Sequence, residues 1–541
     1  MKRLLLFAVF LCGHQLSYGQ AFTRSDTLRG SVTPERAWWD LVYYHLEVEV
    51  MPEEKRITGQ NTMHYRVLSE QNILQIDLQD PLKITEITQD GQVLRYRKEG
   101  SAYFVQLTSK QPKNAVKTLI IQYEGQPRIA VRAPWDGGFS WERDDNGKHF
   151  IATSNQSLGA SVWWPCRDHM GDEVDSMLIS VEVPEDLVDV SNGRLRAVEH
   201  NEVDKTKTYH WFVGNPINNY GVNLNIGDYV SWEEVYAGEK GPLDVTYWAL
   251  RADEKRARKQ FKEVPRMLEA FEHWMGPYPF YEDGFQLVQA PYLGMEHQSS
   301  ITYGNGFQNG YRGRDLSETG WGMKFDFIIV HESGHEWFAN NLTHADVADM
   351  WLHESFTAYS ESLFLEYWFS KEAGREYVRG TRFNIENAKP MIGAYGVDDH
   401  SYPIDVYYKG SNMLNTLRSI VNDDEAWRGL MRGLGERFYH STTSSKEVEA
   451  FMAETLGLSL ESFFDQYLRD RSLPVLEYYF KEGKLYYRWT QVVSNFAMPV
   501  DVSIGERKVR LEPRRDWQSV GTKAQQLEVD LNYYISTLKS R

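Results

Sequence analysis

Two histidines and a glutamate with the spacing of metal ligands stand in the segment HESGHEWFANNLTHADVADMWLHESFTAYSE. His331 and His335 are four residues apart, so on a helix both imidazoles lie on one face and can reach one ion at about 2.0 to 2.1 Å. Glu332 is offset from that pair, which leaves its carboxylate able to act on a water molecule. Glu354 follows, with eighteen residues between it and His335. It is the expected third ligand, because catalytic zinc keeps three protein ligands and one open position.

The charge of this set indicates its chemistry. Two neutral imidazoles and one carboxylate leave the zinc site with a net charge of about +1, which acidifies a bound water and polarises a carbonyl. His353 is adjacent to Glu354 but points about 100° away on the same helix, so we expect it to orient a ligand or to lie on the surface. We expect His344 in a loop, and Glu336 and Glu361 as carboxylates that support the ligands or face solvent.

A buried helix is needed to hold His331, Glu332 and His335, and the sequence before them predicts such a helix. The preceding run FDFIIV is apolar enough to bury the helix, and ionisable groups turned inward from a buried helix need a partner such as a metal ion. The next helix, in WLHESFTAYSE, is expected to return antiparallel after the connecting residues 340–349.

The N-terminus has the layout of a secretory signal peptide. MKRLLLFAVFLCGHQLSYGQ combines a basic start, an apolar run over residues 4–12 and small residues near its end, and the run is too short to span a bilayer. Removal of residues 1–19 would leave Cys166 without a partner for an intrachain disulfide. No later run of about 18 apolar residues occurs, so we expect an exported protein, periplasmic or secreted, without stable membrane insertion.

Length and charge bound the domain count and the partners. A chain of 541 residues is long enough for about two to four domains. The formal net charge of -17 argues against a nucleic-acid or anionic-lipid partner, because both are polyanions. No pattern in the sequence indicates an oligomeric state.

The period of the apolar residues divides the chain. From about residue 40 to 230 the period is mostly two, in stretches such as HLEVEV, KTLIIQYEG and MLISVEVPE, which predicts antiparallel strands. Helical spacing begins near Asp253. Strands return after Pro474, where VLEYYFKEGKLYYRWTQV and VDVSIGERKVRLEP predict two hairpins. The expected units are a signal peptide at 1–19, an N-terminal β domain at 20–231, a catalytic domain at 232–472 and a C-terminal β domain at 473–541.

Three further segments carry a family resemblance. With its HExxH, eighteen residues and then Glu, the sequence resembles the aminopeptidase N family of zinc metallopeptidases, the gluzincins, over about residues 40 to 490. SNQSLGASVWWPCRD is similar to a glutamine-containing segment of that family that ends in Pro-Cys-x-Asp, so Cys166 is interpreted as a packing residue. PYLGMEHQSS is similar to the family's Gly-x-Met-Glu-Asn exopeptidase motif, and DVYYKGSNMLNTLR to its Tyr-Glu-Lys-Gly followed by a helix.

The resemblance implies roles for residues in these segments. Glu296 would pair with the free α-ammonium of a peptide, and Gly294 and Met295 would belong to the same substrate-binding segment. Gln156 falls where the family places a glutamine that contacts substrate. Tyr407 aligns with the family's catalytic tyrosine, whose hydroxyl would stabilise the oxyanion of the tetrahedral intermediate.

The sequence departs from the family pattern at three positions. Leu293 replaces the usual first glycine of the exopeptidase motif, His297 replaces its asparagine, and Tyr408 stands where glutamate is common. A bulkier or more basic neighbour of Glu296 would narrow the first subsite, weaken amine binding or change the side-chain preference.

The family's architecture implies an α+β multidomain protein. It consists of an N-terminal antiparallel β saddle, a thermolysin-like, mostly helical catalytic domain and a small C-terminal β-sandwich. The residues after Pro474 suffice for the sandwich but not for the large helical domain that often follows it, so we expect a more open active site.

The expected function is that of an exported zinc-dependent aminopeptidase with one Zn²⁺ per chain. It would hydrolyse N-terminal residues from peptides through a zinc-activated water, with Glu332 as the general base. A zinc endopeptidase of the same fold is an alternative, favoured by the altered residues beside Glu296. A catalytically silent peptide-binding protein is another, disfavoured because ligands, base and tyrosine occur together. A non-peptide hydrolase has no distinctive support.

Overall fold

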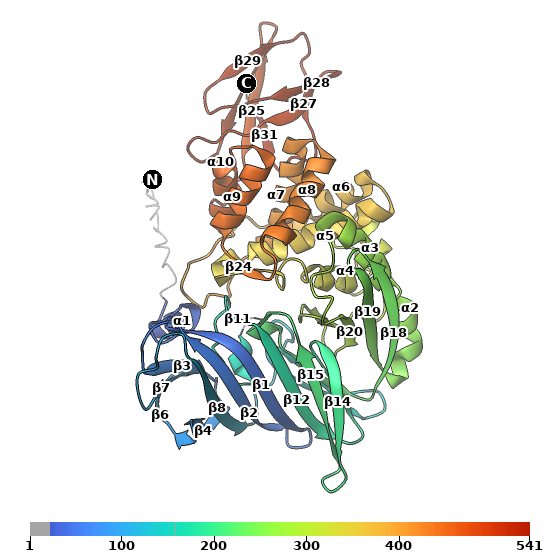
Figure 1. Ribbon diagram of the computed structural model, residues 1–541. Helices are drawn as coiled ribbons and strands as arrows, with labels where there is room; N and C mark the ends of the chain where they lie inside the picture. Colours follow the sequence, from blue (N-terminus) through green and yellow to red (C-terminus); the bar gives the residue numbers. More distant parts are fainter. Residues whose placement is uncertain (1–21, 157, 541) are drawn as a thin grey trace, which may run out of the picture.

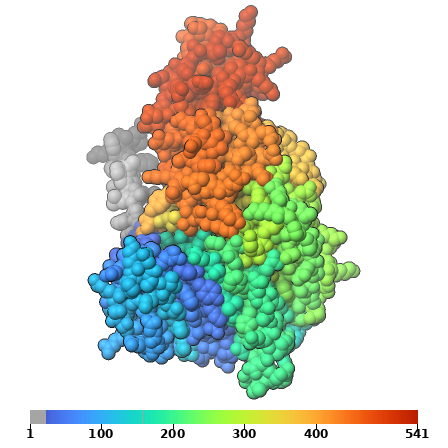
Figure 2. Space-filling view, viewed as in Figure 1, coloured from blue at the N-terminus to red at the C-terminus, as the bar shows by residue number. Residues whose placement is uncertain are grey.

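The computed structural model describes residues 22–156 and 158–540, and the predicted signal peptide at 1–19 lies outside them. Figure 1 shows the β-sheets of the N-terminal region at one end, a helical region in the middle and the small C-terminal sheets at the other end. Figure 2 shows the same three parts stacked along the length of the molecule. The predicted α+β multidomain fold is confirmed.

An eight-stranded sheet is the main element of the N-terminal region, with strand order β14-β15-β12-β1-β2-β8-β4-β5. Its neighbouring strands are antiparallel apart from β1 and β12, which run parallel. A parallel pair needs a long crossover, and more than a hundred residues separate these two strands. The strands are β1 (Trp39–Met51), β2 (Arg56–Val67), β4 (Lys83–Gln89), β5 (Gln92–Val93), β8 (Val116–Gly125), β12 (Ser176–Pro184), β14 (Arg194–Asn201) and β15 (Thr206–Val213).

Alternating side chains build the core beneath this sheet. In β1, Tyr44, Leu46 and Val48 are buried while the residues between them are partly exposed, as the period of two predicts. Cys166 is fully buried in the same core and makes no disulfide. Burial raises the pKa of its thiol, so the cysteine is an inert packing residue, as interpreted from the sequence.

Three smaller sheets complete the N-terminal region. Their orders are β13-β17-β10-β9, β3-β7-β6 and β11-β16. β10 ends at Ser154, two residues before Gln156. A seven-residue helix, α1 (Arg24–Gly30), precedes the sheets. The strands are β3 (Ile73–Asp77), β6 (Arg95–Glu99), β7 (Ala102–Gln106), β9 (Gly138–Arg143), β10 (His149–Ser154), β11 (Glu173–Val174), β13 (Val188–Ser191), β16 (Ile217–Asn218) and β17 (Leu224–Gly227).

A five-stranded sheet, β18-β19-β20-β22-β21, opens the middle region. The predicted helical run after Asp253 is two helices, α2 and α3, broken at Phe261 and Lys262. Pro265 is the third residue of α3, where its missing N–H has no intrahelical partner to lose. The strands are β18 (Tyr229–Gly238), β19 (Gly241–Leu250), β20 (Phe285–Gln289), β21 (Gly294–Met295) and β22 (Ser300–Tyr303). The helices are α2 (Glu254–Gln260), α3 (Glu263–Met275), α4 (Phe327–Gly334), α5 (Trp351–Trp368), α6 (Lys371–Gly380), α7 (Asp405–Val421), α8 (Asp424–Arg437), α9 (Ser445–Leu456) and α10 (Glu461–Phe464).

Helix α4 is short, buried and capped at its start. The side chain of Asp326 accepts hydrogen bonds from the backbone N–H groups of Ile328 and Ile329, which satisfies two donors of the first turn. All eight residues of α4 are buried, as the apolar run before the histidines predicted. The chain then passes through β23 (Leu342–His344) and a 3-10 turn, Val347–Asp349, into α5.

Close packing of α7 against α5 sets the position of the residues on both helices. A β-carbon at Gly410 would lie 1.8 Å from Ser355 Oγ, so only glycine permits this approach. Ser355 Oγ also donates a 2.6 Å hydrogen bond to the carbonyl oxygen of Val406. The N-terminal halves of α5 and α7 are thereby held together.

The C-terminal region contains a four-stranded sheet, β29-β26-β25-β31, and a three-stranded sheet, β28-β27-β30. Both predicted hairpins are confirmed, because β25 pairs antiparallel with β26 and β27 with β28. No helix among the described residues is long and apolar enough to cross a membrane. The strands are β25 (Val475–Lys481), β26 (Lys484–Thr490), β27 (Val500–Ile504), β28 (Arg507–Leu511), β29 (Gln518–Gly521), β30 (Leu527–Val529) and β31 (Ser536–Lys539).

Replacing Gly410 by alanine should destabilise the protein by about 1–3 kcal/mol, because the added methyl group overpacks the contact with α5. Thermal unfolding measures the effect. Gly429→Ala is the matched control, since Gly429 is an exposed glycine of α8 with open space around its β position. That change should be neutral or stabilising, as alanine is the better helix former by about 1 kcal/mol. Equal melting temperatures for the two variants would contradict the packing argument.

Candidate active site

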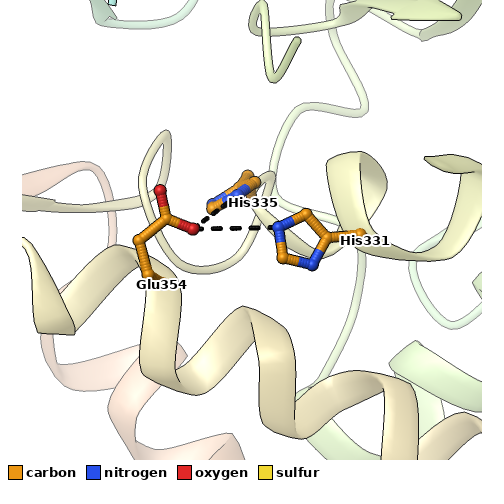
Figure 3. Close-up of side chains that lie close together, drawn as sticks. All are labelled: His331, His335 and Glu354. Carbon is orange, nitrogen blue, oxygen red and sulfur yellow. Dashed lines mark ion pairs between the residues drawn. The ribbon is translucent and has the colours of Figure 1, made fainter. Parts of the chain in front are cut away.

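His331, His335 and Glu354 meet in a buried cluster between α4 and the first turn of α5 (Figure 3). Glu354 Oε2 lies 3.7 Å from His331 Nε2 and 3.4 Å from His335 Nε2, and the three ligand atoms all lie within 4.8 Å of one another. Glu354 Oε2 is buried and accepts no hydrogen bond from the described residues. An ion bound about 2.0–2.2 Å from each ligand atom would supply the missing partner, so this donor set fits zinc.

Each histidine is held by its second ring nitrogen, which leaves Nε2 for the metal. His331 Nδ1 lies 2.7 Å from Glu361 Oε1, and the other oxygen of Glu361 accepts a hydrogen bond from Tyr377. His335 Nδ1 lies 3.0 Å from the carbonyl oxygen of Phe338. Such contacts fix the tautomer and the ring orientation of a ligand. Glu361 is therefore a buried support of the site and not a solvated carboxylate.

The pKa values of Glu354 and of the neighbouring Glu332 are shifted in opposite directions. Burial opposes ionisation of Glu354, but the adjacent His335 and His331 outweigh it and lower its pKa to about 2. For Glu332, burial dominates over the attraction of His331, and the nearby Glu296 adds repulsion, so its pKa is raised to about 7. A carboxylate with a pKa near neutrality suits a group that accepts a proton and returns it.

Glu296 lies directly after β21 and faces the same cluster. Glu296, Glu332 and His335 present atoms within 4.8 Å of one another. Glu296 is only 3 % exposed, and burial raises its pKa although His335 opposes the shift. Gln156 Nε2 donates a hydrogen bond to Glu296 Oε1, and Asn340 Nδ2 donates one of 2.9 Å to the Glu296 carbonyl oxygen. The predicted substrate residues Gln156 and Glu296 are thus in contact.

Gly294 and Met295 form β21 and place this acid beside α4. A β-carbon at Gly294 would lie 2.7 Å from Ile328 Cγ2 and 2.9 Å from Glu332 Oε1. The glycine therefore allows the strand to approach the helix closely enough for Glu296 to reach the cluster. Both Gly294 and Met295 line the cleft, so the structure places all four predicted substrate residues together.

Tyr407 lies in the first turn of α7. It contacts the carboxylate oxygen of Glu354 that does not face the two histidines. Its hydroxyl donates a 2.9 Å hydrogen bond to Glu354 Oε1. Burial and the negative charge of Glu354 raise the pKa of Tyr407, so the phenol stays a hydrogen-bond donor at neutral pH. The structure thus brings Tyr407 to the cluster of His331, His335 and Glu354, as the resemblance implied.

The neighbouring histidines differ from expectation. His344 ends strand β23 and is fully buried, so its placement in a loop was wrong. The ring of His353 is also fully buried; it stacks on His344 with centroids 4.0 Å apart and accepts a 3.0 Å hydrogen bond from the His344 backbone N–H. Burial lowers the pKa of both rings, so they are neutral. His353 therefore holds the connection between α4 and α5, away from the surface.

Two other residues discussed from sequence are also buried. Glu336 accepts hydrogen bonds from Tyr278 and Asn340, so it supports the backbone that follows α4. His297 is fully buried, and burial lowers its pKa to about 3. It does not line the cleft and is neutral, so it adds no basic group beside Glu296, and its effect on specificity stays a prediction. Leu293 and Tyr408, the other two departures from the family pattern, do line the cleft.

The three ligands, Glu332, Tyr407 and the four predicted substrate residues line one cleft of about 440 Å³. Sequence reasoning missed several residues of its wall. Tyr402, five residues before Tyr407, lies in an irregular loop with no local signal, whereas Phe327 precedes His331 by four residues on the same helix face and could have been found from that spacing. The wall residues that were missed are Pro134, Trp135, Tyr311, Leu316, Phe327, Ile328, Tyr402 and Ile404.

Comparisons with known proteins identify the family of this chain. The peptidase M1 N-terminal domain matches residues 41–220, and the peptidase family M1 domain matches residues 260–467. Probable aminopeptidase 1 of Saccharolobus solfataricus is 22% identical over 344 residues, which are 61% of this chain and 42% of that protein. Aminopeptidase B of Mus musculus is 24% identical over 57% of this chain and 46% of its own length. The chain thus spans about half the length of these curated relatives.

Solved structures share the fold over a larger part of their length. The M1 zinc metallopeptidase from Deinococcus radiodurans has a TM-score of 0.67 at 20% identity, covering 81% of this chain and 94% of that one. A mutant of that peptidase bound to the substrate Tyr-Ser-Ala also has a TM-score of 0.67, at 19% identity, covering 83% of this chain and 98% of that one. With two M1 domains matched in order and the three ligands in place, the chain belongs to peptidase family M1, the aminopeptidase N family of gluzincins.

Proposed function

We propose that this protein is a zinc-dependent aminopeptidase that releases N-terminal residues from peptides. One observation carries the proposal: the buried carboxylate of Glu296 lies within 4.8 Å of Glu332 and His335, at the edge of the ligand cluster. The described residues that line the cleft include no lysine or arginine to neutralise it. The α-ammonium group of a peptide is a cation that would do so.

Zinc held by His331, His335 and Glu354 would supply Lewis acidity that acidifies water and polarises a carbonyl. The side chains of the protein would carry out the proton transfer and stabilise the negative charge on the carbonyl oxygen. Glu332 accepts a proton from the attacking water and returns it to the amine that leaves, a role that its position beside His335 and Glu296 allows. The Tyr407 hydroxyl donates its single hydrogen to Glu354 in this structure, and it would turn this hydrogen to the carbonyl oxygen as negative charge develops there.

Restriction to the first residue follows from the position of Glu296. A peptide whose amine pairs with this carboxylate has its first carbonyl, and no later one, beside the ligand cluster. Gln156 donates a hydrogen bond to Glu296 and so holds the acid in place. The names of the relatives, which include aminopeptidases, and the tripeptide bound to the Deinococcus radiodurans peptidase support peptides as the substrate class.

Export is a further part of the proposal, supported by the basic start and short apolar run of the first 19 residues. Fractionation of cells that express the full chain, followed by N-terminal sequencing, tests it. We expect a mature protein outside the cytoplasm that begins near Gln20. An uncleaved chain confined to the cytoplasm would show that this segment is not a signal peptide.

Glu332→Gln should keep its zinc and lose turnover by about 10²- to 10⁴-fold, because the amide cannot accept the proton. Metal analysis and kcat on a peptide substrate measure the two effects separately. Glu354→Gln should instead lose zinc, since it removes a charged ligand. The control is Glu436→Gln, the same change at an exposed position of α8, which should alter neither. Near-normal turnover in zinc-loaded Glu332→Gln would refute the assignment of the base.

Free and N-acetylated forms of the same short peptides distinguish the remaining functions. The unaltered protein should release single N-terminal residues from the free peptides only, and a zinc chelator should abolish the activity. Glu296→Gln should weaken kcat/KM on free peptides by about 10- to 100-fold, because the ammonium loses its counter-charge. Equal cleavage of acetylated peptides would identify an endopeptidase, and no cleavage by the zinc-loaded protein would identify a binding protein.

A further inference from the structure

An apolar wall lies beside His331 and is distinct from the groups that bind the amine. Phe327 stacks on the His331 ring, with centroids 5.0 Å apart and planes 14° apart. Tyr311 meets Phe327 edge-on, with centroids 5.4 Å apart. Leu316 and Tyr408 line the same cleft and are partly exposed to it. We call Tyr311, Leu316, Phe327 and Tyr408 the aromatic box.

The aromatic box and Glu296 lie at opposite ends of the ligand cluster. Glu296 groups with His335 and Glu332 within 4.8 Å, a set that does not include His331. The rings of His331 and His335 are 5.0 Å apart, and it is His331 that carries Phe327 on its face. The order along the cleft is therefore Glu296, then His335, then His331, then the box.

A bound peptide must follow this order. Its amine pairs with Glu296, and its first carbonyl lies at the ligand cluster. The next α-carbon is about 3.8 Å further along the chain, on the side away from Glu296. The first side chain departs from the same α-carbon as the amine, so it stays near Gln156 and Met295, at the other end.

We propose that the aromatic box binds the side chain of the second residue, the one that becomes the new N-terminus, and that it selects peptides with a large apolar residue there. This inference rests on the proposed aminopeptidase function and specifies its substrate class. The box contains no ionised side chain, and aromatic faces favour aromatic and aliphatic partners. A charged second residue would be desolvated there without a counter-ion.

The test is a tripeptide series on the zinc-loaded protein in which only the second residue changes: Leu-Phe-Ala, Leu-Ala-Ala, Leu-Glu-Ala and Leu-Lys-Ala. Release of leucine gives kcat/KM for each. We expect Leu-Phe-Ala to exceed the Glu and Lys peptides by at least about tenfold, the discrimination that one apolar subsite provides. Rates within about twofold across the series would overturn the inference and leave the aminopeptidase function standing. No release from any peptide would overturn both.

A charge placed in the box should redirect the preference. In Leu316→Lys the kcat/KM ratio of Leu-Glu-Ala to Leu-Phe-Ala should rise by at least about tenfold, because the new ammonium pairs with the glutamate. Leu458→Lys is the matched control: Leu458 is likewise partly buried but lies after α9, outside the cleft, and the ratio should keep its original value. An unchanged ratio in folded Leu316→Lys would overturn the placement of the box. If that variant does not fold, the tripeptide series still decides the proposal.

Discussion

The constraint on which the rest of the structure depends is a buried oxygen of Glu354 to which no described residue donates a hydrogen bond. Two imidazole nitrogens converge on it at 3.4 and 3.7 Å, in a cluster almost closed to solvent. Removing an ionised carboxylate from water costs several kcal/mol unless a cation or hydrogen-bond donors replace the solvent. A zinc ion would meet that need, and the fold of the protein holds the three ligands together for it.

Helix packing and buried hydrogen bonds provide that rigidity. Asp326 caps α4, Glu361 fixes His331 from behind, and Gly410 lets α7 lie against α5. These contacts place His331, Glu354 and Tyr407 on helices and His335 at the C-cap of α4, where side chains are held more accurately than on loops. The loop that carries Tyr402 forms only a wall of the cleft.

The N-terminal region is part of the site, because Gln156 reaches Glu296 across the boundary between the two regions. Asn340 connects the segment that carries Glu296 to the residues that follow α4. Its amide donates hydrogen bonds to the Glu296 carbonyl oxygen and to the Glu336 carboxylate. The cleft thus has an acidic end that suits a peptide amine and an apolar end beside His331. For the proposed function, this polarity would give a bound peptide one direction.

The sequence by itself determined the local elements and the ligand set. The period of two predicted the N-terminal strands, and the spacing of His331, His335 and Glu354 predicted a shared metal, because both depend on residues close in the chain. The contribution of Gln156 and Glu296 came from a family resemblance. Only the tertiary structure decided that His297 and His353 are buried and neutral, and that Phe327 and Tyr311 form a wall beside His331. Burial and cleft lining depend on elements far apart in the sequence, and no local pattern records which of them meet.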